Sequence, residues 1–394
     1  MLNSEFIIEL REIIVLMLDA ASQSSFALTC NSAKKFIKEV VRIKGKERFI
    51  CIAAREGYLD LVKFSLDCGY ELCIDACSNA ALNGHLDVIQ WAQQYGCDWD
   101  WTTSSYAASN GHLNVIEWAV KNGCPWNDWI CLSAVPNGHL NIIQWSRLNG
   151  YQWNDHTCNQ AAEYGHLHIL QWVHENGCPM HPAAGASAAK NGHFEICKWV
   201  HENGCELTLR VCREAASNGH FQILQWARSN GCPWDKLTCA YAARGCHLEI
   251  LQWARLNGCD WDELTCEYAA KGGYLEVLQW ARSMGCPWNE KTCEIAVLKG
   301  HLNILQWARQ NGCPWDEFTC TNAAYKGHLN ILQWARSNGC QWDENTCIGA
   351  VLKGHLNVLE WARSNGCAWN IDECMRIAKD KKYEKIVKWI SENN

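Results

Sequence analysis

The sequence predicts an all-α solenoid of stacked helix-turn-helix repeats. Three observations predict this fold: two glycines recur at one fixed interval, an apolar helical face follows the first of them, and no unit carries an insertion. The first glycine recurs at multiples of 27 residues: Gly57, Gly84, Gly111, Gly138, Gly165, Gly192, Gly219, Gly273, Gly300, Gly327 and Gly354. Cys246 holds the one remaining slot, and a second glycine lies twelve residues after every slot.

Each unit is expected to hold two short helices, as residues 300–326 illustrate. Apolar side chains recur at helical spacing over residues 301–311, which predicts an amphipathic helix. Gly312 follows its last turn, where a left-handed residue commonly ends a helix. Asp316 can then cap the next helix, which is the first helix of the following repeat, over residues 317–326, with Cys320 on its inner face. Helices this short are marginal alone, so neighbouring units must stabilise them.

The repeat boundaries divide the chain into three parts. Residues 46–370 form twelve repeats, and residues 371–394 form a degenerate repeat that caps the C-terminal end. Residues 1–45 do not fit the repeat and are expected to form a helical cap over the first apolar face. Residues 178–212 depart from the pattern, which indicates either a bend or contact site, or a drifted repeat.

Composition and charge exclude several classes of function. The net charge of −7 and the pI of about 6.1 argue against a nucleic-acid partner. No apolar run is long enough to span a membrane, and Glu5, Glu9 and Glu12 interrupt the N-terminal apolar stretch, so we expect neither membrane insertion nor secretion. The 26 cysteines are therefore expected as thiols in a reducing compartment, the cytoplasm.

The repeated tryptophans and cysteines are interpreted as core filler. A buried indole removes ~150–250 Å² from water, and thiols behave as small apolar groups. A base-stacking platform is the alternative for the tryptophans, but an acidic chain lacks the positive charge that such binding needs. Close metal-ligand spacing occurs only among Cys68, Cys73 and Cys77, in one degenerate unit. We therefore predict no metal and no cofactor.

Histidine and arginine also recur at fixed positions of the repeat. The histidines that follow the repeat glycine are expected to form local hydrogen bonds in the turn, because ten equivalent copies do not make one catalytic site. A ladder of arginines runs from Arg147 to Arg363. Phosphate contacts are one interpretation, and pairing with acidic loop residues such as Asp262 and Glu317 is the favoured one.

Residues 321–340, TNAAYKGHLNILQWARSNGC, resemble the core of an ankyrin repeat, in which a helix carrying Ala-Ala is followed by Gly-His and a second helix ending in Asn-Gly. The resemblance covers residues 48–394. Ankyrin units usually have about 33 residues and a β-turn finger, so we expect these shorter units to lack long β-hairpin fingers. Short, tryptophan-rich units of this kind resemble ankyrin-type proteins of giant DNA viruses of amoebae.

Ankyrin-like stacking implies that variable positions of the first helix line a concave groove that holds a protein partner. Tyrosines there would be anchors, since tyrosine is enriched at interfaces. The partner-binding residues predicted in this way are Tyr106, Gln160, Tyr164, Glu214, Tyr241, Tyr268, Asn322 and Tyr325. The alternative is a solvated face with incidental aromatic residues.

Residues 11–36 resemble an F-box, although Glu9 and Leu10 replace its usual Leu-Pro opening. The matching residues are Glu12, Ile13, Ile14, Met17, Leu18, Leu28, Cys30 and Phe36. F-box families dock through this surface on the adaptor of cullin-type ubiquitin ligases. The alternative is a plain helical cap.

The sequence therefore predicts a non-enzymatic scaffold that binds a protein partner on its concave face. In its more specific form the chain is a substrate receptor that recruits a ubiquitin-ligase adaptor through the N-terminus. The alternative is a structural or virion-assembly protein without a client. No catalytic residues are predicted, because no Ser/His/Asp, Cys/His or carboxylate constellation stands outside the repeat.

Overall fold

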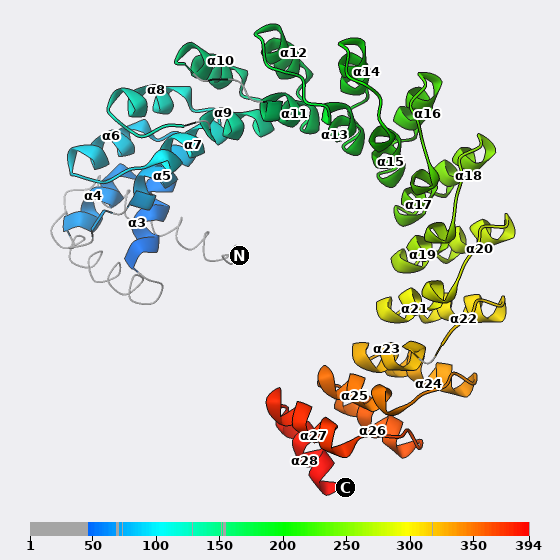
Figure 1. Ribbon diagram of the computed structural model, residues 1–394. Coiled ribbons are helices and arrows are strands. Elements are labelled where there is room, and N and C mark those ends of the chain that lie inside the picture. Colours follow the sequence, from blue (N-terminus) through cyan, green and yellow to red (C-terminus); the bar gives the residue numbers. More distant parts are fainter. Residues whose placement is uncertain are drawn as a thin grey trace, which may run out of the picture. The chain divides into compact units, whose positions relative to one another are not determined.

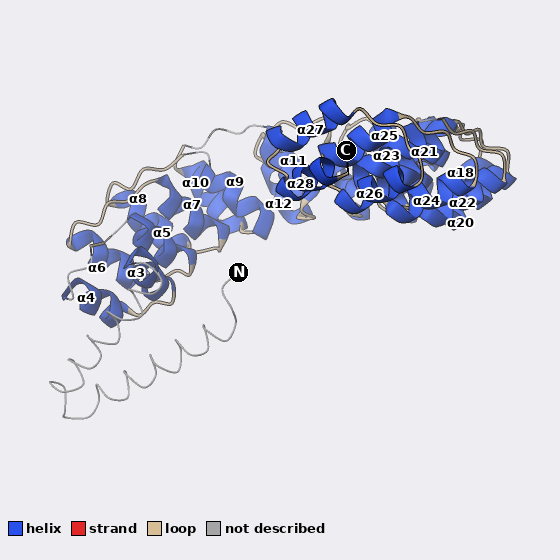
Figure 2. Cartoon of the chain, turned by 90° about the horizontal axis from the view of Figure 1, so that it is seen from below, coloured by secondary structure: helices blue, strands red, loops and turns tan. Residues whose placement is uncertain are grey.

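The computed structural model describes residues 46–67, 71–72, 74–127, 129–150, 152, 155–316 and 318–393. The F-box-like face, including Glu12, Ile13 and Phe36, lies outside these residues. Helices are the only regular elements of the described part (Figure 2). None of these helices is long and apolar enough to span a membrane. The predicted all-α repeat fold without hairpin fingers is confirmed.

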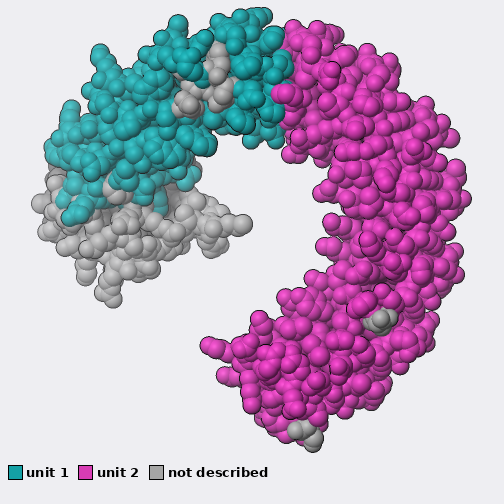
Figure 3. All heavy atoms as spheres, in the orientation of Figure 1, with its two compact units in different colours: residues 1–181 teal, residues 182–394 magenta. Residues whose placement is uncertain are grey.

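The chain forms two compact units, Met1–His181 and Pro182–Asn394 (Figure 3). In the first unit the helices are α3 Lys46–Arg55, α4 Leu59–Asp67, α5 Ile74–Leu82, α6 Leu86–Gln94, α7 Trp101–Ser109, α8 Leu113–Lys121, α9 Trp129–Ala134, the 3-10 turn η1 Val135–Asn137, α10 Leu140–Leu148, α11 Asp155–Glu163 and α12 Leu167–Glu175. The unit boundary falls within the drifted block, residues 178–212.

The second unit continues the same alternation. Its helices are α13 Ala184–Lys190, α14 Phe194–Glu202, α15 Leu209–Ser217, α16 Phe221–Ser229, α17 Lys236–Arg244, α18 Leu248–Leu256, α19 Glu263–Gly272, α20 Leu275–Ser283, α21 Glu290–Lys299, α22 Leu302–Gln310, α23 Phe318–Lys326, α24 Leu329–Ser337, α25 Glu344–Leu352, α26 Leu356–Ser364, α27 Ile371–Asp380 and α28 Glu384–Glu392.

Within each unit the first helices of successive repeats form one row and the second helices form another (Figure 1). We call the odd-numbered helices the inner row, because they lie on the concave side of each unit, and the even-numbered helices the outer row. Helices of the inner row pack side by side, whereas those of the outer row contact mainly the inner helix of their own repeat. The curvature of each unit follows from this difference in spacing.

Small residues let the inner row pack this closely. Ala323 and Ala324 of α23 are fully buried, as are Ile304 and Leu305 of the outer helix α22. Alanine brings helix backbones near one another, while branched residues of the outer helix fill the space between the rows. Each helix therefore obtains its stability from its neighbours, as the short helix length requires.

Capping side chains mark the start of inner helices, and glycines mark the end of outer helices, where the sequence predicts. Asp262 and Asp343 accept hydrogen bonds from the backbone N–H two residues on, at 3.1 and 3.0 Å. After the outer helix α22, Gly312 has φ +83°. At Asp316, the backbone carbonyl accepts from the Thr319 N–H at 3.2 Å.

Candidate binding surface

Tryptophan and arginine together join the outer row. The loop tryptophan of one repeat meets the helix tryptophan of the next edge-on, as Trp288 does Trp307, with ring centroids 5.7 Å apart. From Arg228 to Arg363 the arginine before the loop lies over the loop indole, as Arg282 does over Trp288 at 4.1 Å, and donates a hydrogen bond to the carbonyl of the following cysteine. These Arg-Trp-Trp groups fill the wider gaps between outer helices.

These contacts correct two sequence predictions. The described repeat tryptophans are half-buried rather than core residues, because they occupy the loops and the open spacing of the outer row. The arginines from Arg228 to Arg363 stack on indoles instead of pairing with acidic loops, and Asp262 pairs with Lys236 at 2.8 Å. Glu317 lies outside the described residues. Arginine is suited to stacking because its guanidinium is planar and weakly hydrated.

The repeat histidines close the local turn through their backbone, as predicted, and their rings also link neighbouring repeats. The Nε2 atoms of His139, His166 and His220 lie 3.0–3.2 Å from backbone carbonyl oxygens 30 residues earlier. The expected local hydrogen bond is also present, because the backbone N–H of His220 donates to the Ala215 carbonyl at 2.9 Å and that of His301 to the Ala296 carbonyl at 2.8 Å. Burial lowers the pKa of His112, His247 and His328, which favours the neutral imidazole.

The cysteines form buried ladders, as predicted for structural thiols. The Sγ atoms of Cys158 and Cys178 are 2.9 Å apart, and those of Cys212 and Cys232 are 3.3 Å apart. Burial raises the pKa of Cys124 to about 11, so this thiol stays protonated at neutral pH. Among the described residues no three His, Cys, Asp or Glu side chains form a group that could hold a metal ion. Cys68 and Cys73 lie outside these residues.

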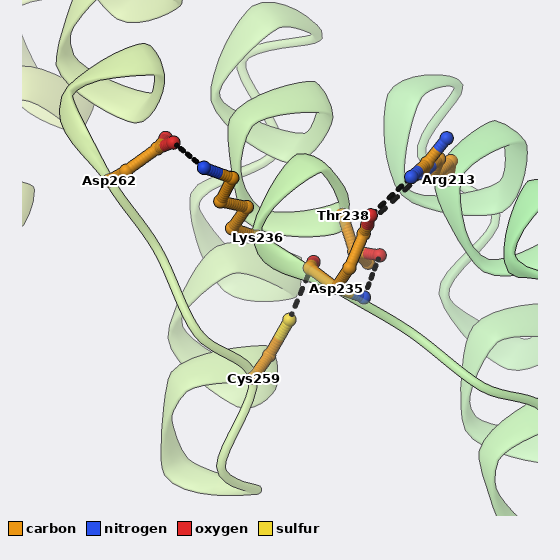
Figure 4. Close-up of polar contacts among 6 residues, drawn as sticks. All are labelled: Arg213, Asp235, Lys236, Thr238, Cys259 and Asp262. Atoms are coloured by element: carbon orange, nitrogen blue, oxygen red, sulfur yellow. Dashed lines mark hydrogen bonds and ion pairs between the residues drawn. The ribbon is translucent and has the colours of Figure 1, made fainter.

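Polar side chains connect successive inner helices (Figure 4). Arg213 of α15 forms a two-bond ion pair with Asp235, whose side chain also caps α17 together with Thr238. The arginine holds the pKa of the Asp235 carboxyl below its usual value. The Cys259 thiol donates to the Asp235 carbonyl at 3.2 Å. One aspartate thus joins two successive repeats of the second unit and also binds the loop after α18.

Seven of the eight predicted partner-binding residues lie on inner-row helices, and the eighth, Tyr164, directly follows one. In the first unit, Tyr106 of α7 is 42 % exposed and Tyr164, just after α11, is 49 % exposed. Gln160 is half-buried, and its Oε1 atom has no hydrogen-bond partner. These side chains give the inner row of this unit exposed aromatic surface.

In the second unit the predicted residues interact with one another or with neighbouring charges. Tyr241 and Tyr268 stack, with ring centroids 6.0 Å apart and an angle of 15° between the rings. Asn322 donates to Glu294 at 3.2 Å, and Glu214 pairs with Arg210 at 3.6 Å. These contacts fix the orientation of residues that the sequence only placed on a helix face.

Sequence reasoning missed a set of lysines at the ends of the inner helices. The ammonium groups of Lys326 and Lys353 lie 5.5 and 4.9 Å from the centre of the Tyr325 ring. Lys299, Lys326 and Lys353 recur at the repeat interval of 27 residues, a signal that the sequence contains. Attention to the aromatic residues alone left the positive charge of this surface unnoticed.

Comparison with known proteins gives remote structural likeness only. No protein-family model and no curated protein matches the chain. The human ASB11 ankyrin repeat domain is similar at 16 % identity and a TM-score of 0.33, covering 40 % of this chain and 84 % of that domain. The pentatricopeptide repeat protein PPR10, solved in complex with an 18-nt psaJ RNA element, is similar at 12 % identity and a TM-score of 0.40, covering 96 % of this chain and 78 % of that one. This chain is a helical repeat protein. Its fold is established by its own helices rather than by these likenesses.

Proposed function

We propose that the chain is a scaffold that binds a protein partner along its inner row. The observation that supports the proposal is a difference between two sets of residues. Alanine, cysteine, histidine and tryptophan make the same contacts from repeat to repeat. The exposed residues of the inner row, by contrast, differ between repeats and include tyrosines. Tyr106 and Tyr164, nearly half exposed, are its clearest anchors. Exposed tyrosine offers a large contact area at a small cost in conformational entropy.

Co-purification from cells tests this proposal. The variant Tyr106→Ala/Tyr164→Ala should lower partner recovery about tenfold or more, because interface tyrosines often contribute ~1–2 kcal/mol each. The matched control is Leu148→Ala/Leu256→Ala, which removes apolar side chains that are 87 % and 82 % exposed at the ends of outer helices. Loss of the partner in the control and its retention in the tyrosine variant would contradict the proposal.

The more specific receptor function is supported by sequence alone. Glu12, Ile13, Ile14, Leu18, Leu28 and Phe36 make up the F-box-like face that would recruit a ubiquitin-ligase adaptor. The variant Ile13→Asp/Leu18→Asp should remove such an adaptor from the purified complex while leaving an inner-row partner bound. A chain found only in assembled particles, with no client and no adaptor, would favour the structural alternative. Exclusion of nucleic acid and a cytoplasmic location stay predictions.

A further inference from the structure

Positive charge gathers at the C-terminal ends of the inner helices in the second unit. We call this set the basic rim: Arg244, Lys271, Lys299, Lys326, Lys353 and Lys379. All six are exposed and lie in the last turn of an inner helix or directly after it. One cation comes from each of six consecutive repeats, from α17 to α27.

The need to end a helix does not account for these lysines. Cations do stabilise helix C-termini, but earlier repeats use asparagine in the slot of Lys299, Lys326 and Lys353. There Asn83 and Asn137 donate to backbone carbonyls of the preceding repeat at 2.6 and 2.7 Å. Asn110, Asn191 and Asn218 in the same slot donate to carbonyls of their own helices. Lysine replaces the amide, and with it a hydrogen bond to the backbone, by an exposed charge.

The charge of the rim is least compensated in its middle part. Among the described residues, no acidic side chain forms an ion pair with any of its six cations. Near Arg244 and Lys271 the next outer helix begins with Leu-Glu, whereas after Lys299, Lys326 and Lys353 it begins with Leu-Asn. Lys299, Lys326 and Lys353 therefore form a run of cations without nearby acidic residues in the following helix.

Tyrosine rings accompany the cations. Lys326 and Lys353, from neighbouring repeats, approach the same ring, Tyr325, so their ammonium groups lie within about 10 Å of each other. Tyr241 and Tyr268 lie beside Arg244 and Lys271 in the same way, at 5.9 and 6.0 Å. Grooves that combine aromatic rings with polar groups are the usual docking sites of proline-rich segments.

The spacing of the rim fits one backbone conformation. Packed helices lie ~8–10 Å apart, so cations one repeat apart in adjacent inner helices recur at about that distance. A polyproline II helix rises ~3.1 Å per residue and has three residues per turn. Every third side chain therefore points the same way, at intervals of about 9 Å. An extended β-strand does not match, because residues three apart face opposite sides.

We propose that the basic rim binds an acidic, proline-rich segment of a partner protein in the polyproline II conformation, with a carboxylate at every third residue. This inference rests on the proposed scaffold function and names the chemistry of the partner. Each carboxylate meets one cation of the rim, while prolines between them pack on the tyrosine rings. A nucleic acid fits less well, because Tyr241 and Tyr268 stack on each other and the chain is acidic overall.

The test measures fluorescence anisotropy of labelled peptides with the full-length chain at low ionic strength. The probe is a peptide of repeated Glu-Pro-Pro, compared with a peptide of the same composition whose glutamates form one block. The probe should bind about tenfold more tightly than the block peptide, and its affinity should fall with added salt. Lys299→Glu/Lys326→Glu/Lys353→Glu should weaken binding about tenfold or more, since each reversal replaces an attraction by a repulsion.

The control variant Lys121→Glu/Lys291→Glu/Lys385→Glu makes the same change of net charge at exposed residues outside the rim, and it should change the affinity less than about twofold. Circular dichroism of both variants checks that they fold. Equal affinity for the two peptides, equal losses in the two variants, or tighter binding of a single-stranded RNA of the same length would each overturn the inference. If the probe fails but an inner-row partner is still recovered in a tyrosine-dependent manner, only this inference fails and the scaffold function stands.

Discussion

Two glycines of one repeat offer a matched test of what joins neighbouring repeats. Gly219 and Gly231 have nearly the same backbone conformation, φ +81° and +80°. A Cβ atom on Gly219 would lie 2.6 Å from Cε1 of His247 in the next repeat, whereas a Cβ atom on Gly231 would meet nothing within 4 Å. Replacing each by alanine therefore separates backbone strain from the contact between repeats.

The expected magnitudes differ accordingly. A left-handed conformation costs an alanine about 1–2 kcal/mol relative to glycine, and Gly231→Ala should show only this loss. Gly219→Ala should lose about 1–3 kcal/mol more, because the added methyl group displaces His247, which is also hydrogen-bonded to the backbone at Ser217. The free energy of local opening, measured by hydrogen exchange of amides in α17 and α18, reports both values.

A double-mutant cycle identifies the cause of the difference. In a His247→Ala background, Gly219→Ala should cost no more than Gly231→Ala does, since the ring that causes the clash is gone. Persistence of the larger loss in that background would refute the reasoning. The chain offers one natural parallel: where Cys246 replaces the glycine, with φ +63°, the next repeat carries Tyr274 in place of histidine.

Three other measurements follow from the contacts between repeats. Trp288→Leu should lower the free energy of unfolding by about 1–3 kcal/mol, since it removes both the edge-on contact with Trp307 and the stacking of Arg282. An unchanged urea midpoint would contradict this prediction. Burial lowers the pKa of His112, His247 and His328, so the unfolded chain binds more protons than the folded one as the pH falls through ~6.5. The urea midpoint should therefore be lower at pH 5.5 than at pH 7.5. An equal or higher midpoint at pH 5.5 would show that these histidines do not determine how stability depends on pH. Cys246 is exposed, whereas Cys124 is buried and its pKa is raised to about 11. Cys246→Ser should therefore remove one rapidly reacting thiol in a disulfide-exchange assay, and Cys124→Ser should remove none. Loss of a rapidly reacting thiol in the Cys124 variant would show that Cys124 is accessible and would refute the prediction.

The sequence predicted the helices well because their signals are local. The apolar period over residues 302–310, the cap before each inner helix and the glycine after each outer one all lie within a few residues of the element they define. The burial of Cys320 was also predicted, since a strict repeat places this cysteine at the same helical position every time. The predicted tyrosines lie on the inner row for the same reason.

The contacts that the side chains of histidine, tryptophan and arginine make between repeats could not be predicted in this way. His220 contacts the carbonyl of Lys190, and Trp288 contacts Trp307, so each interaction joins one repeat to another. In a periodic sequence equivalent positions of neighbouring repeats hold the same residue type. The pattern therefore does not show whether a side chain contacts a residue of its own repeat or the equivalent residue of the next one. The spacing of the two rows in space decides that question.

The contacts between neighbouring repeats have a consequence for how a gene that encodes such repeats changes in length. The histidine-to-carbonyl bond spans 30 residues and the thiol-to-carbonyl bond spans 24, so neither reaches beyond an adjacent copy. Recombination between near-identical coding segments that removes or duplicates one whole copy would bring together two ends that already fit. Such genes can therefore gain or lose whole repeats while point substitutions alter the exposed positions. The length of the solenoid and its choice of partner can then evolve separately.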